Sequence, residues 1–101
     1  MKLKIKDKVH AQCKRCFAEF DIPSSNFNYE GEIVDKRVMG PEFQHTLYYN
    51  GQCKNCQMYY YFKIDAWEYP KDCINYTDPD GNGIIYDIPT LVNENDEEIN
   101  V

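Results

Sequence analysis

Cys13-Lys14-Arg15-Cys16 is matched, after 36 intervening residues, by Cys53-Lys54-Asn55-Cys56. Each Cys-x-x-Cys pair can place two thiolates on one metal ion, and two pairs complete a tetrahedron of four sulfurs. Four free cysteines or a single disulfide would leave two matched pairs unexplained. The spacing therefore predicts a structural metal site. Zinc is the expected ion, and iron, which also accepts four thiolates, is the alternative.

Alternating apolar and polar residues flank both pairs and predict strands. Residues 2–10 and 17–22 lie on either side of the first pair, and residues 43–52 and 58–66 on either side of the second. Each pair is therefore expected at the tip of a hairpin. Further strands are predicted over 32–39 and 83–88. The predicted fold is mostly β and zinc-ribbon-like, with two Cys-x-x-Cys hairpins extended by further strands.

This arrangement resembles the broad zinc-ribbon and rubredoxin-like class, through Cys13, Cys16, Cys53, Cys56 and their flanking strands. The resemblance covers about half of the chain. Arg37-Val-Met-Gly-Pro-Glu42 and Trp67-Glu-Tyr-Pro70 look like segments of small uncharacterised bacterial zinc-ribbon proteins, a likeness that implies no particular activity. Family turns often carry Pro after the first cysteine and Gly after the second. This chain departs from that pattern, with Lys14 and Lys54 at the first position and Phe17 and Gln57 at the second.

Charged residues are unevenly distributed along the chain. Residues 1–16 hold six basic residues against Asp7 alone and carry +5, whereas residues 17–101 hold five basic and sixteen acidic residues and carry −11. An acidic body disfavours broad binding to a phosphate backbone. We expect one domain over residues 1–92 and a mobile acidic tail over 93–101. With no signal-peptide pattern and no apolar run of transmembrane length, we expect a cytoplasmic protein without membrane contact.

Three further residues of metal-binding type need an interpretation. Cys73 has no partner pair, and a buried inert thiol is expected. His10 lies three residues before Cys13, but with four cysteines present we expect a strand residue or a donor to a ligand. His45 lies on the apolar face of its strand, so a hydrogen-bonded core histidine is expected.

A second ion is considered at Asp78-Pro-Asp-Gly-Asn-Gly83, which resembles the start of an EF-hand calcium loop. Asp78, Asp80 and Asn82 would supply the first ligands. Pro89 stands where the loop needs its bidentate Glu, and neither flank is helical. We therefore favour a tight turn at this segment over a calcium site.

Tyrosine is in excess, with nine Tyr against five Phe and one Trp. Tyr48, Tyr59 and Tyr61 are expected to share an outer strand face, either as a contact surface or beneath a cover formed by residues 74–92. We find no phosphate loop or catalytic triad pattern and expect no enzyme. The leading interpretation is a zinc-binding adaptor for another protein. The alternatives are nucleic-acid binding through the basic N-terminal strand and electron transfer by rubredoxin-like iron.

Overall fold

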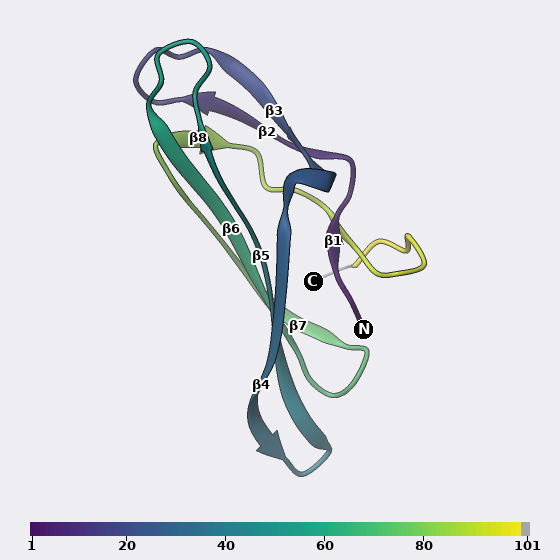
Figure 1. Ribbon diagram of the computed structural model, residues 1–101. Coiled ribbons are helices and arrows are strands. Elements are labelled where there is room, and N and C mark those ends of the chain that lie inside the picture. Colours follow the sequence, from purple (N-terminus) through teal and green to yellow (C-terminus); the bar gives the residue numbers. More distant parts are fainter. Residues whose placement is uncertain (100–101) are drawn as a thin grey trace.

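The structure is a computed structural model that describes residues 1–99, and it confirms a mostly β fold (Figure 1). The strands are antiparallel and form three sheets, of order β1-β9, β3-β2-β8 and β4-β5-β6-β7. No helix in the described part of the chain is long and apolar enough to cross a membrane. In chain order the elements are β1 (Lys4–Ile5), β2 (Lys8–Cys13), β3 (Glu19–Pro23), the 3₁₀ turn η1 (Ser24–Asn26), β4 (Asn28–Arg37), β5 (Gly40–Gln52), β6 (Tyr59–Glu68), β7 (Ile74–Asn82), β8 (Ile84–Tyr86) and β9 (Leu91–Val92).

Two hairpins carry the cysteine pairs, as the alternation predicted. Strands β2 and β3 pair from Lys8 opposite Pro23 to Gln12 opposite Glu19, and the first cysteine pair closes their turn. Strands β5 and β6 pair over ten residues, up to Gln52 opposite Tyr59. Both turns lie at the same end of the molecule, where Figure 1 shows the β2–β3 and β5–β6 turns side by side.

All three sheets contribute to the core, which lies between the inner face of the four-stranded sheet and the two smaller sheets. Alternate residues of each strand point inward, which follows from the two-residue period of a strand. The Phe62 ring is fully buried and makes an edge contact with Tyr86, at 4.8 Å between ring centroids. The other buried members of the core are Leu3, Ile5, Val9, Ala11, Ile22, Leu47, Ile64, Ala66, Ile74, Ile84 and Leu91.

The N-terminal segment forms two strands where one was predicted. Asp7 adopts a left-handed backbone conformation, with φ of 60°, and this separates β1 from β2. The two strands join different sheets, since β1 pairs with β9 and β2 with β3 and β8. The alternation survives the break, because Ile5 and Val9 are both buried.

The acidic tail does not extend away from the domain over the residues that the structure describes. Ile99 packs against the core, and its backbone N–H donates to the Leu91 carbonyl at 2.9 Å. The returning segment pairs its carboxylates with the basic N-terminal strand, at 2.7 Å between Lys4 and Asp96. Residues 100 and 101 of the predicted mobile tail lie outside the described residues.

The turn predicted at 78–83 is wrong. Asp78, Asp80 and Asn82 lie within β7, which pairs with β6 along most of its length. Pro79 is tolerated there because β7 is an edge strand, where one row of backbone groups needs no partner. The chain turns only at Gly83, whose φ of 81° suits glycine. The EF-hand-like loop is therefore not formed.

Candidate metal centre

The four predicted ligands come together in space. Their Sγ atoms all lie within 4.8 Å of one another, and they are the one group of three or more candidate metal ligands among residues 1–99. The Sγ atoms of Cys13 and Cys56 are 3.6 Å apart, as are those of Cys16 and Cys53. A zinc ion bound at about 2.3 Å to each of four sulfurs requires edges of about 3.8 Å. The cluster therefore fits a tetrahedral ion.

Each cysteine pair is presented by a short turn with the same hydrogen bonds. In the first turn the Phe17 N–H donates to the Cys13 carbonyl at 2.9 Å, and in the second Gln57 donates to Cys53 at 2.8 Å. The residue after each pair adopts a left-handed conformation, with φ of 62° at Phe17 and 63° at Gln57. The turns expected from the zinc-ribbon resemblance thus form without glycine, at the steric cost that a side chain brings in this region.

A glutamine before each cysteine pair completes a repeat that our sequence analysis missed. The Gln12 side-chain amide donates to the Phe17 carbonyl at 3.0 Å, and Gln52 donates to the Gln57 carbonyl at 2.8 Å. Each bond ties the strand before a turn to the residue after it. The signal was present in the sequence as Gln-Cys-Lys-x-Cys at both sites.

The protein surroundings of the sulfurs favour thiolates unequally. Hydrogen bonds from the Asn55 side chain and the Ala18 N–H lower the pKa of Cys16 to about 6. The Met58 N–H acts to lower the pKa of Cys56, but burial and the three neighbouring sulfurs outweigh it and raise that pKa to about 11. Four adjacent thiolates need a cation among them, which the protein itself does not supply inside the cluster.

The donor set decides what a bound ion can do. Cys13 and Cys53 are buried and Cys16 and Cys56 half-buried, so the cluster faces solvent on one side only. Four cysteines fill a tetrahedral ion completely and leave no position for substrate or water. Such an ion would cross-link the two hairpins. Zn²⁺ and Fe²⁺ both suit the site.

The remaining cysteine and the histidines lie elsewhere. Cys73 is exposed, which corrects the expectation of a buried thiol, because it lies in the turn that follows β6. His10 is exposed on β2 and binds Asp21 at 2.8 Å and Glu19 at 3.2 Å. His45 is the predicted core histidine, 1% exposed.

The outer face of the four-stranded sheet carries the predicted tyrosines. Residues 74–92 do not cover it, since β7 lies beside β6 in the same sheet while β8 and β9 belong to the other two sheets. Tyr48 opposes Lys63, and Tyr61 lies between Asn50 and Asn82 on the neighbouring strands. We define the outer face as the side chains that register places on this side: Asn28, Glu30, Glu32, Gln44, Thr46, Tyr48, Asn50, Gln52, Tyr59, Tyr61, Lys63, Asp65, Trp67, Tyr76, Asp78, Asp80 and Asn82.

Carboxylates hold two of these tyrosines in place. The Tyr48 hydroxyl donates to Glu30 and the Tyr61 hydroxyl to Asp80, both at 3.1 Å. These bonds and the nearby negative charges raise the pKa of both tyrosines. Asp78 and Asp80, considered above for calcium, thus belong to an acidic and aromatic surface.

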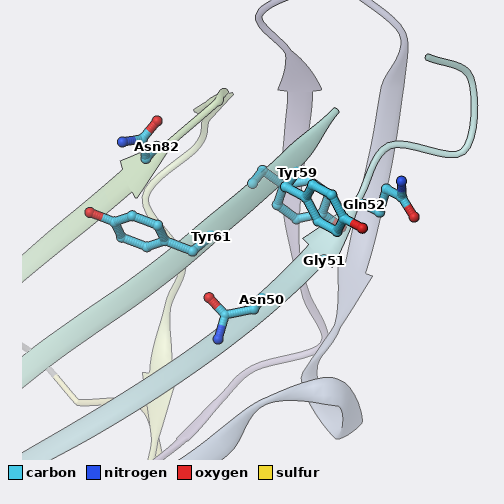
Figure 2. Close-up of a pocket in the computed structure, with 7 residues that line it drawn as sticks. Asn50, Gly51, Gln52, Tyr59, Tyr61 and Asn82 are labelled. Atoms are coloured by element: carbon cyan, nitrogen blue, oxygen red, sulfur yellow. The ribbon is translucent and has the colours of Figure 1, made fainter. Parts of the chain in front are cut away.

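A hollow of about 520 Å³ lies at the metal end of the outer face, above Gly51. Figure 2 shows Tyr59 and Tyr61 on one side of β6, with Asn50 on β5 and Asn82 on β7. Tyr59 is 77% exposed. The hollow is lined by aromatic rings and carboxamides and by no charged residue.

Comparison with family models, with curated protein sequences and with solved structures finds no match for this chain. Function must therefore be argued from the surface and the cysteine cluster.

Proposed function

We propose that this protein is a cytoplasmic, non-enzymatic adaptor that binds zinc at Cys13, Cys16, Cys53 and Cys56 and binds a basic protein partner on its outer face. One observation carries the proposal: an uncovered sheet face that combines aromatic rings with carboxylates. Surfaces of sheets are ordinarily apolar and covered, or polar and merely solvated. Tyr and Trp dominate the energetics of protein interfaces, and this face bears four Tyr and one Trp.

The charge of the outer face supports a cationic partner. Glu30, Glu32, Asp65, Asp78 and Asp80 contribute carboxylates, against the single ammonium of Lys63. Asp65 is already engaged by Thr46 at 2.6 Å and by Lys63 at 3.6 Å. The other four carboxylates are on exposed residues. Lysine or arginine side chains of a partner would meet opposite charge and aromatic faces together.

Nucleic-acid binding through the basic end has less support. Lys4 and Lys6 pair with Asp96 and Glu98 of the returning tail, and Lys8 pairs with Asp21. Their positive charge is therefore partly balanced within the protein, whereas phosphate binding needs cations that can displace counterions.

Iron in place of zinc would favour an electron carrier. The four-sulfur cluster accepts either ion, so metal analysis of protein isolated from its native host decides between them. About one zinc per chain supports the adaptor, whereas a red iron protein supports electron transfer.

The adaptor is tested by partner capture from extracts of the native host. The double substitution of Tyr59→Ala and Tyr61→Ala should reduce recovery of a specific protein at least tenfold while zinc content stays at one per chain, because aromatic hot spots contribute about 2 kcal/mol or more. A matched control replaces Lys2, Lys4, Lys6 and Lys8 by Gln and should change recovery little.

The opposite ranking would overturn the adaptor. If the lysine variant alone loses its partner, and the partner is a nucleic acid bound with a steep salt dependence, the function resides in the basic end.

A further inference from the structure

A second cavity, of about 500 Å³, lies between β3 and the second cysteine turn. One wall is the whole of β3, the outer strand of the three-stranded sheet. The other wall includes Tyr49, Gln52 and Lys54. We call this cavity the edge groove. It is distinct from the hollow above Gly51, although Gln52 and Tyr60 line both.

The backbone of β3 offers unpaired hydrogen-bonding groups to the edge groove. The Cys13 N–H donates to the Ala18 carbonyl, and the pairing continues as Ala11 with Phe20 and Val9 with Ile22. In an antiparallel pair, residues alternate between facing the partner strand and facing away from it. The N–H and C=O groups of Glu19 and Asp21 therefore point away from β2. Only β2 pairs with β3 among residues 1–99.

The opposite wall of the edge groove is also a strand edge. β4 pairs with β5 no further than Asn28 opposite Tyr48. Residues 49–52 therefore have β6 on one side and, within the described residues 1–99, no strand on the other. The Cys53 N–H donates to the Met58 carbonyl. By the same alternation, the backbone groups of Gln52, which lines the edge groove, point away from β6. Two unpaired edges thus border one cavity.

The floor of the edge groove is aromatic. The Phe20 and Tyr60 rings lie 5.0 Å apart between centroids, and Tyr49 lies 6.2 Å from Tyr60. Outside the floor, the exposed side of β3 carries Glu19 and Asp21, which both bond His10, and Asp21 also pairs with Lys8. Two carboxylates thus face a single lysine, so this side of β3 keeps an excess of negative charge.

From these observations we propose that the edge groove binds an extended peptide that adds to β3 as a further antiparallel or parallel strand. Unpaired N–H and C=O groups in a row are recognised by another backbone, which is how strand addition works. The alternation of a strand then fixes the side chains of the peptide. Residues facing the floor would be apolar, and residues beside Glu19 and Asp21 would be basic, because opposite charges on adjacent strands stabilise their pairing.

This inference rests on the proposed function, and it specifies that part of the basic partner binds as an extended strand beside β3. The hollow above Gly51 adjoins the edge groove through Gln52 and Tyr60. A partner could thus lay one extended segment along β3 while the rest of it covers Tyr59 and Tyr61.

The test uses a phage-displayed library of random nine-residue peptides, selected against the zinc-loaded full chain. We expect enriched peptides that alternate apolar with basic residues. Asp21→Pro removes the outward N–H of β3 without removing a backbone bond to β2, and both variants lose the side-chain bonds to Lys8 and His10. Asp21→Pro should weaken the best synthetic peptide about tenfold relative to Asp21→Ala, the upper end of what loss of one hydrogen bond brings. Both variants lack the carboxylate, so their difference isolates the N–H.

A second measurement does not depend on how Asp21→Pro folds. N-methylation of alternate amides in the peptide should abolish binding in one register and spare it in the other. Amide hydrogens of Glu19 and Asp21 should exchange rapidly in the free protein and at least about tenfold more slowly in the complex, because they gain partners.

Three outcomes would overturn the edge groove. They are selection of no peptide, binding that tolerates every N-methyl group, and unchanged exchange at Glu19 and Asp21 in the complex. If host-partner capture depends on Tyr59 and Tyr61 but is equal in Asp21→Pro and Asp21→Ala, the adaptor stands without the edge groove.

Discussion

The imidazole of His45 lies 2.7 Å from the carboxylate of Glu68, and both side chains are almost completely buried. The other ring nitrogen of His45 bonds the Tyr29 hydroxyl at 2.6 Å, and the second oxygen of Glu68 accepts the Asp72 N–H at 2.6 Å. The chain of bonds joins β4, β5 and β6 to the turn after β6. Every member has a partner, which is the condition under which a buried polar network is tolerated.

Glu68→Ala should destabilise the fold by about 3 kcal/mol, because it leaves the buried His45 without its acceptor or donor and orphans the Asp72 N–H. Glu68→Gln should cost clearly less, since an amide can both accept from Asp72 and bond the imidazole. Chemical denaturation in excess zinc measures both variants. Equal losses would show that charge, not hydrogen bonding, is what Glu68 contributes.

Cys16→Ser and Cys53→Ser should each lose the bound metal and most of the folded structure, because binding of the ion is coupled to folding. Metal analysis and circular dichroism report the two losses. Cys73→Ser is the matched control and should keep one ion per chain at a cost within about 0.5 kcal/mol, since Cys73 is exposed. Loss of metal in the control would mean that the ligands are misassigned.

In the zinc-loaded protein, Cys73 should be the one thiol that reacts rapidly with an aromatic disulfide reagent. The other four would be held as ligands, whereas Cys73 is exposed. Thiol titration before and after addition of a strong chelator should rise from about one to about five reactive groups, the cysteine total of the chain. A count of five before chelation would contradict metal ligation by the cluster.

Phe17→Asn should be more stable than Phe17→Val by about 1 kcal/mol or more. Phe17 adopts a φ of 62°, which Asn tolerates and a β-branched residue does not. The side chain is exposed, so little packing is lost in either variant. Denaturation at a fixed concentration of free zinc makes the comparison, and equal stability would mean that the turn relaxes to another conformation.

The pKa of His10 should lie above 6.5 in the folded protein, because the hydrogen bonds that its ring donates to Asp21 and then to Glu19 favour its charged form. The stability that this pairing contributes is present below pH 6.5 and is lost as pH rises through the folded-state pKa. An NMR titration of the ring protons reads the pKa directly. Asp21→Asn should lower it, and a pKa that does not respond would show that the ring does not bond Asp21 in solution.

Local patterns were enough to predict the hairpins and the cluster, because each cysteine pair and its flanking strands are determined within about ten residues. Local patterns did not predict the structure of residues 78–83. Asp-Pro-Asp-Gly has the residues of a tight turn, and only the long-range pairing of β7 with β6 draws it into a strand. The break at Asp7 was missed because a left-handed residue leaves the alternation of Ile5 and Val9 intact.

The tail and the groove could not be predicted for a related reason. The return of Asp96 to Lys4 joins residues 92 positions apart, which no local pattern encodes. β3 has a free edge because, among residues 1–99, β2 is the strand that pairs with it and no second strand does. The order of strands in the sheet determines this, and local sequence does not encode that order. Tyr48, Tyr59 and Tyr61 share one face, as predicted, because apolar and polar residues alternate in sequence from Phe62 to Ala66 and the pairing of β5 with β6 keeps that register.

The four-cysteine cluster and the β4–β5 turn lie at opposite ends of a molecule 50 Å long (Figure 1). The free energy of metal binding thus acts at one end, whereas Val38 and Met39 at the other end are exposed and β4 has no fully buried residue. Local opening should therefore begin at Val38 and Met39 and advance toward the metal, so that amide exchange becomes slower along β5 from Gly40 to Gln52. Local stability would thus decrease along the molecule, from the hairpins that the metal joins to the β4–β5 turn at the other end.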